Sequence, residues 1–238
     1  MNIKTLVLAG EGINCETETA LAFTQAGSEA QIIQVEDFLT LPTLDEFDIL
    51  VFPGGFSYGD EIKSGRIMAE QIKLHQNANI TKFNQEKKPI LGICNGFQIM
   101  TQLGLFDEEK RNISLTQNDH GQFINKWTTC VVHPHKTFWT QNLPAQIDLP
   151  IRHKEGRIQA VDTSQLIPVL TYTEDVNGSH DKIAALTNSG GNLLGLMPHP
   201  EAATNYILSP HQKNKQLGRA PALQIFINAV NYSKERKV

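Results

Sequence analysis

Four short apolar runs in the first hundred residues limit the folds open to this chain more than any other feature. They are KTLVLAG, AQIIQV, FDILVFPGG and PILGIC, and longer stretches with polar faces separate them. Runs of Val, Ile and Leu with little alternation are typical of strands buried on both faces of a sheet. The pattern predicts parallel βαβ units, in which helices near residues 15–26 and 66–85 flank a twisted sheet.

The period changes after about residue 111, where short β-like runs are separated by Pro, Asn and Gly turns. This half is expected to be antiparallel or mixed. GGNLLGLMPHPEA reads as one more buried strand that ends at Pro198, and APALQIFINAVNY reads as a closing amphipathic helix. With no repeat or linker in between, the pattern predicts a single α/β domain over residues 1–238.

Charge and cysteine content narrow the possible partners and the compartment. The net charge is -4 and no stretch is rich in Lys or Arg, which argues against nucleic acid or an anionic membrane as the main partner. Apolar runs of the length needed to cross a bilayer are missing from the sequence. Three cysteines are too few, and odd in number, for a disulfide framework, so we expect a reducing, cytoplasmic location.

The segment LGICNGFQIM holds the first candidate for chemistry. Cys94 follows a buried strand and precedes a helical run, with Gly92 and Gly96 two residues to either side. Such spacing is typical of a sharp strand-to-helix turn that projects a nucleophile, and the amides of a helix N-terminus stabilise a thiolate. A packed strand cysteine would explain this motif about equally well. Cys15 and Cys130 lack the paired glycines and are interpreted as structural.

A cysteine hydrolase also needs a base and a group that orients it, and MPHPEA offers both. His199 and Glu201 are two residues apart, so in an extended segment their side chains project from the same face. His120 and His153 lie in loops that could reach a cleft, whereas the other histidines have polar or turn-rich contexts. None of the histidines or cysteines has the spacing usual for zinc, so no metal site is expected.

Further candidates follow from the chemistry of an amide carbonyl, whose oxygen becomes negative on attack. The backbone amide of Asn95, directly after Cys94, is a natural donor, and a second could come from Gly55 or Phe56 in the PGGFSYG loop. Gln98 lies one helical turn beyond Cys94 and could bind an amino-acid substrate. An ordinary tight loop and an ordinary helix surface are the alternatives.

Together these segments resemble the class I glutamine amidotransferases, which have a flavodoxin-like fold. The general marks are PGG at 53–55, GICNGFQ at 92–98 and HPE at 199–201. GINCETE, PGGFSYGD, the Arg-Asn pair at 111–112, HKEGR and NGS are more similar to the glutaminase subunits of phosphoribosylformylglycinamidine synthases. The resemblance covers nearly the whole chain. It makes Asn112 a candidate substrate contact.

The resemblance implies a Cys-His-Glu triad made of Cys94, His199 and Glu201 that hydrolyses glutamine through a glutamyl thioester. Ammonia would pass to a large synthase subunit that converts formylglycinamide ribonucleotide to formylglycinamidine ribonucleotide, and a small accessory subunit would join the complex. ATP and magnesium are expected on the large subunit and no cofactor on this chain, which lacks a GxxxxGK[ST] loop.

Two alternatives remain beside this interpretation. A stand-alone cysteine hydrolase would keep the fold and the triad. A nucleotide-binding protein is suggested by the partial GxG at Gly10 and Gly12, although its third glycine is missing. The chain also departs from the family pattern at Lys154, at Val176 and over residues 106–110, which bears on how it docks to partners.

Overall fold

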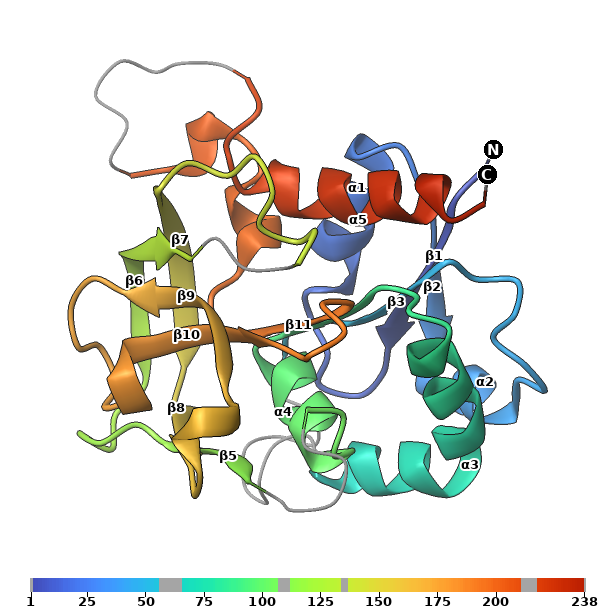
Figure 1. The fold of residues 1–238 in the computed structure, drawn as a ribbon, viewed down its shortest axis with the longest axis horizontal. Coiled ribbons are helices and arrows are strands. Elements are labelled where there is room, and N and C mark those ends of the chain that lie inside the picture. The colour runs from blue at the N-terminus through green and yellow to red at the C-terminus, as the bar shows by residue number, and fades with distance from the viewer. Residues whose placement is uncertain (1, 56–65, 107–111, 134–136, 211–217, 238) are drawn as a thin grey trace.

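The computed structural model describes residues 2–55, 66–106, 112–133, 137–210 and 218–237 (Figure 1). Within these ranges the chain builds one nine-stranded sheet in the order β2-β1-β3-β4-β11-β10-β9-β6-β7, and a separate two-stranded sheet, β5-β8. The first five strands of the large sheet are parallel and the remaining pairings are antiparallel. The predicted fold class is therefore confirmed.

The parallel half comes almost entirely from the first hundred residues, and its last strand returns from much later in the chain. β3 and β4 are buried at every position, as their continuous apolar sequences require. The strands are β1 (Lys4–Ala9), β2 (Glu29–Gln34), β3 (Ile49–Phe52), β4 (Ile90–Ile93) and β11 (Leu193–Leu196).

Helices cover both faces of the parallel half (Figure 1). One face carries α1 (Glu16–Gln25) and α5 (Leu223–Glu235), which meet through an edge-to-face contact between Phe23 and Phe226 with ring centroids 5.1 Å apart. The opposite face carries α2 (Val35–Thr40), α3 (Arg66–Gln85) and α4 (Asn95–Gln102). The helices in the described ranges include none with the length and apolarity that a membrane crossing needs.

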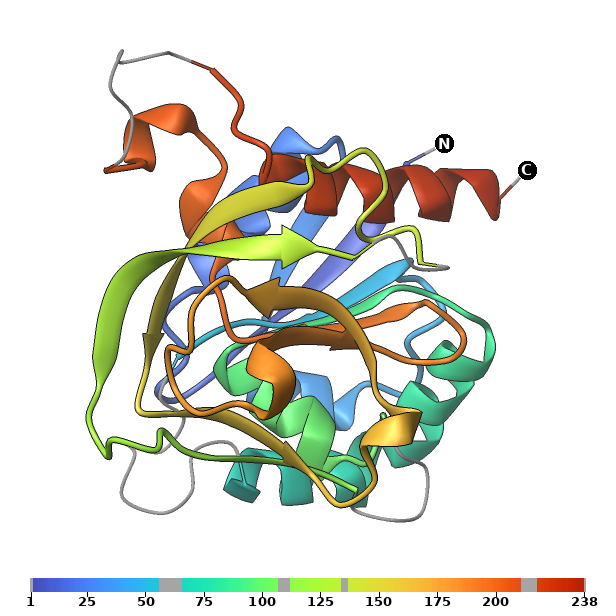
Figure 2. The same ribbon diagram turned by 60° about the vertical axis from the view of Figure 1, so that its left-hand side comes forward.

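The antiparallel half curls away from the parallel strands, as the bent ribbons of β6 and β7 show in Figure 2. It consists of β6 (Ile124–Val132), β7 (Gln146–His153), β9 (Ile167–Tyr172) and β10 (Ile183–Thr187), while β5 (Ile113–Gln117) pairs with β8 (Glu155–Ala160). Short 3₁₀ turns complete the chain: η1 (Thr163–Gln165), η2 (His180–Lys182), η3 (Pro200–Ala203) and η4 (Tyr206–Leu208).

Most elements lie where the sequence predicts them, and three do not. α3 begins and ends at the predicted residues, whereas α2, β5 and β7 are not anticipated by the apolar pattern. β7 carries Pro150, which normally argues against a strand; it is tolerated here because β7 is the edge strand of the sheet. α2 is only six residues long, too short for a helical period to show.

Candidate active site

Cys94 occupies a strained turn between β4 and α4. Its backbone has φ 51° and ψ -107°, a conformation that costs about 1–3 kcal/mol in a residue other than glycine. The neighbouring strand holds the turn, because the Cys94 amide donates to the Leu196 carbonyl at 2.8 Å. The side chain is 4% exposed and its Sγ lies 3.7 Å from the carbonyl oxygen of Arg152. The sharp turn that the glycine spacing predicts is therefore present.

His199 and Glu201 form a buried pair directly beyond the end of β11. His199 Nδ1 lies 2.6 Å from Glu201 Oε1, and the two residues are 2% and 3% exposed. The backbone of His199 is fixed by a hydrogen bond from its amide to the Pro150 carbonyl at 2.8 Å. With Nδ1 directed at the carboxylate, Nε2 is the ring nitrogen left for chemistry, and it has no hydrogen-bond partner among the described residues.

The environment of His199 favours its charged form. Burial by itself would lower the pKa of His199, but the Glu201 carboxylate and the thiols of Cys15 and Cys94 raise it, and the net pKa is well above its ordinary value. The guanidinium of Arg152 lies 4.0 Å from Glu201 Oε1 and adds positive charge beside the carboxylate. An imidazolium adjacent to Cys94 is the arrangement that supports a thiolate nucleophile.

Three potential metal-binding atoms also meet here, from Cys15, His199 and Glu201, all within 4.8 Å of one another. Two ligands of one tetrahedral zinc are separated by about 3.3 Å, given the usual zinc–nitrogen and zinc–oxygen distances. The 2.6 Å spacing of His199 Nδ1 and Glu201 Oε1 is shorter than that and matches a direct hydrogen bond. The cluster therefore fits a base with its orienting carboxylate better than a shared cation.

Of the candidate oxyanion donors that the structure describes, Asn95 directly follows Cys94 at the start of α4, and Gly55 lies in the loop after β3. Asn95 is the fully buried first residue of α4, at the helix end where backbone amides lack helical acceptors. Gly55 follows β3 and forms an isolated β-bridge with Ile13. Phe56 lies outside the described residues. The donor roles of all three remain predictions.

The two predicted substrate contacts have different surroundings. Gln98 lines a cavity of about 310 Å³ between α4 and β5, and its Nε2 donates to the Glu155 carbonyl at 2.6 Å. Asn112 instead bonds backbone at both ends of its amide, donating to the Asp162 carbonyl at 2.7 Å and accepting from the Asp162 amide at 2.6 Å. These bonds fasten the start of β5 to the turn after β8. Binding of substrate by either residue remains a prediction.

Two residues near the pair are not identified as functional by the sequence. Arg152 lies near the end of β7. In the sequence, its neighbour His153 in the segment RHKEGR is the signal that this segment could reach a cleft. Cys15 precedes α1, and its sequence context predicts a structural role, yet its Sγ lies 3.9 Å from His199 Nδ1. Its partner is 184 residues away, so no local pattern could have revealed the contact.

His153 is held neutral in the same region. Burial first, and then the charges of His199 and His120, lower its pKa from 6.5 to about 3. Its Nδ1 lies 3.1 Å from Asn118 Oδ1, which fixes the ring. Because the folded pKa is below the unfolded one, the unfolded chain binds the extra proton between these two values, and stability falls as the pH drops through that window.

On acidification, the free energy of unfolding should therefore fall less for the variant His153→Asn than for the wild type. In the wild type, His153 lowers the free energy of unfolding by about 1.4 kcal/mol per pH unit below 6.5, or by about 2 kcal/mol at pH 5. Asparagine does not titrate, so the variant has no such loss. Urea unfolding of both proteins at pH 7, 6 and 5 should show the stability advantage of the wild type shrinking at each step. Parallel decline of the two proteins would contradict the assignment.

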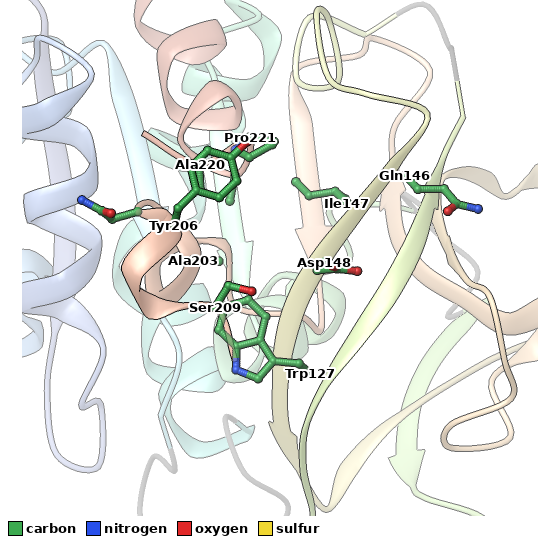
Figure 3. Close-up of a pocket in the computed structure, with 11 residues that line it drawn as sticks. Trp127, Gln146, Ile147, Asp148, Ala203, Tyr206, Ser209, Ala220 and Pro221 are labelled. Atoms are coloured by element: carbon green, nitrogen blue, oxygen red, sulfur yellow. The ribbon is translucent and has the colours of Figure 1, made fainter. Parts of the chain in front are cut away.

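A separate pocket of about 150 Å³ lies between β6, β7 and the turns that follow Glu201 (Figure 3). The picture shows Trp127 and Asp148 on the strands opposite Tyr206 and Ser209. Neither Cys94 nor His199 lines it. The cavity beside Gln98 is not lined by Cys94 or His199 either, but its Gln98 is one helical turn from Cys94 on α4.

Comparison with known proteins agrees with this geometry. The family described as the CobB/CobQ-like glutamine amidotransferase domain matches residues 2–233. Phosphoribosylformylglycinamidine synthase subunit PurQ of Dehalococcoides mccartyi is 34% identical over 98% of this chain and 98% of its own length. The protein of the same name from Thermotoga maritima is also 34% identical, over 98% of this chain and 100% of its own length.

Solved structures give the same result. A chain in the structure of PurLQS from Thermotoga maritima superposes with a TM-score of 0.82 at 33% identity, covering 98% of this chain and 99% of that chain. A glutamine amidotransferase from the same organism shares the fold, with a TM-score of 0.58 at 16% identity over 84% of this chain and 77% of its own. With a buried Cys-His-Glu arrangement at the strand ends and matches that run from end to end, this chain belongs to the glutamine amidotransferase family, together with the PurQ subunits.

Proposed function

We propose that this chain hydrolyses glutamine to glutamate and ammonia and supplies the ammonia to a phosphoribosylformylglycinamidine synthase. The observation that carries the proposal is the strained turn at Cys94 beside the buried pair of His199 and Glu201. The full-length similarity to proteins named as PurQ subunits of that synthase supports the choice of reaction.

The first half-reaction forms a thioester. The Cys94 thiolate attacks the side-chain carbonyl carbon of glutamine, a carbon–sulfur bond forms, and the carbonyl electron pair moves onto oxygen. In this proposal the backbone amides of Asn95 and Gly55 stabilise that oxygen. Nε2 of protonated His199 then gives its proton to the departing nitrogen, the carbon–nitrogen bond breaks, and ammonia leaves.

The second half-reaction returns the enzyme to its starting state. Neutral His199 takes a proton from water, the resulting hydroxide attacks the thioester carbon, and the carbon–sulfur bond breaks to give glutamate and the thiolate. Throughout, Glu201 accepts a hydrogen bond from Nδ1 and keeps the ring in the tautomer that this exchange needs.

The partners follow from the chemistry and from the relatives. Ammonia that escapes to water is protonated and lost as a nucleophile, so the chain should deliver it within a complex. We propose a large synthase subunit that holds ATP and magnesium, and a small accessory subunit, in the cytoplasm. The similar Thermotoga maritima chain comes from a structure of PurLQS, which supports a complex for this chain as well.

The decisive experiment measures glutamate released from glutamine by the purified chain, alone and with the large synthase subunit, ATP and formylglycinamide ribonucleotide. Low activity alone and strong stimulation in the mixture are expected, because docking should complete the site. Equal activity in both conditions would indicate a stand-alone hydrolase. No activity in either would overturn the proposal.

A further inference from the structure

Cys15 is a buried thiol that the reaction described above does not use. It lies 4% exposed immediately before α1, and its Sγ is 3.9 Å from Nδ1 of His199, the same nitrogen that bonds Glu201. Nδ1 therefore has two neighbours that can accept a hydrogen bond from it. One is a strong, charged acceptor and the other is a soft, neutral one.

The thiol is oriented so that its sulfur, rather than its proton, can face the imidazole. Sγ lies 3.3 Å from Asn14 Oδ1, which accepts the thiol hydrogen. Burial raises the pKa of Cys15, so at neutral pH the group keeps this hydrogen. The thiol thus donates to Asn14, and its sulfur is left to accept from Nδ1–H of His199, which also donates to Glu201.

The backbone around Cys15 is tied to the loop after β3, which closes the same space. The amides of Asn14 and Cys15 both donate to the Gly54 carbonyl at 3.3 Å. A Cβ on Gly54 would lie 2.7 Å from His199 Cε1 and 3.3 Å from Cys15 Sγ. Because Gly54 has no side chain, the Cys15 thiol and the His199 imidazole have space to meet. The Thr19 hydroxyl of α1 donates to the Cys15 carbonyl at 2.6 Å and holds its backbone.

We propose that Cys15 is a positioning residue for the base. Its sulfur accepts a second, weak hydrogen bond from Nδ1–H of His199 and, with Glu201, fixes the ring so that Nε2 faces Cys94. This inference rests on the proposed function, since it assigns Cys15 a part in the same hydrolysis. Cys15 touches no reacting atom and is expected to act on turnover and on the charge state of His199, not on glutamine binding.

The test compares Cys15→Ala, Cys15→Ser and Cys130→Ala in the complex with the synthase subunit. Cys130 is the matched control, since it is another buried thiol but is located in β6. In Cys15→Ala the alkaline limb of the pH–turnover profile should move to lower pH by roughly half a unit, as expected when one weak hydrogen bond to the imidazolium is lost. Turnover should fall about fivefold at unchanged KM.

Serine keeps an acceptor at this position, so Cys15→Ser should recover part of both effects, and Cys130→Ala should leave the alkaline limb in place. An unmoved limb in Cys15→Ala, or an equal movement in Cys130→Ala, would overturn the proposal.

A second readout separates this idea from the function on which it rests. ¹⁵N NMR of the histidines in the isolated chain should show His199 titrating at lower pH in Cys15→Ala than in the wild type. That shift without any glutaminase activity would overturn the proposed function and leave the contact standing. Glutaminase activity with no change in either readout would overturn the role of Cys15 alone.

Discussion

Replacing Cys94 with alanine is expected to lower the turnover number for glutamine hydrolysis by about 10⁴-fold or more, because removing a covalent nucleophile leaves only the contribution of binding and oxyanion donors. The loss should appear in turnover, whereas KM should change little. Glutamate release by the variant and the wild type, each in the complex with the synthase subunit, measures it directly.

Two controls make that result specific. Cys130→Ala removes another buried thiol and should keep near-normal activity if it folds. The Cys94→Ala chain should also still support the synthase reaction when ammonium salt replaces glutamine, since only the supply of ammonia is lost. Full glutaminase activity in Cys94→Ala would remove the basis for the proposed mechanism.

The second large effect concerns the fold and is expected from Gly96→Ala. This glycine is the second residue of α4, where alanine would ordinarily stabilise a helix by up to about 1 kcal/mol. Here a Cβ would lie 1.8 Å from the carbonyl oxygen of Phe52 and 2.4 Å from its carbonyl carbon, both backbone atoms of β3. Because helix and sheet must separate to admit the methyl group, we expect a net loss of about 3 kcal/mol or more.

Urea unfolding of Gly96→Ala against Gly104→Ala measures this effect. Gly104 has φ +74° and no atom within 4 Å of the added methyl group, so its substitution costs only backbone strain, about 1 kcal/mol. Equal midpoints for the two variants would show that the close approach of α4 to β3 is not what requires glycine at position 96.

The parts of the site that could be predicted from the sequence are those encoded by neighbouring residues. The turn at Cys94 follows from glycines two positions to either side, and the pair of His199 and Glu201 from their spacing of two. Both signals are local, and the spatial meeting of the two segments was inferred from the family resemblance. The structure explains it, since β4 and β11 are neighbours in the sheet.

What the sequence could not reveal depends on contacts between distant segments. The proximity of Cys15 to His199 arises because α1 and the turn after β11 pack on the same side of the sheet, and nothing near Cys15 encodes it. Arg152 approaches Glu201 from β7, a strand whose proline hides it from the apolar pattern. In both cases the information lies in the tertiary fold.

The adjacency of β4 and β11 also has a mechanical consequence. Cys94 and His199, the proposed nucleophile and base, each follow a strand, and the two strands are joined by backbone hydrogen bonds up to the Cys94 amide itself. The spacing of the two groups is thus set by the sheet, one of the stiffest parts of the molecule. Arg152 and Cys15, by contrast, are carried by an edge strand and by a turn. A docking partner that displaces Arg152 or Cys15 would therefore change the turnover number while the spacing of Cys94 and His199 stays fixed by the sheet.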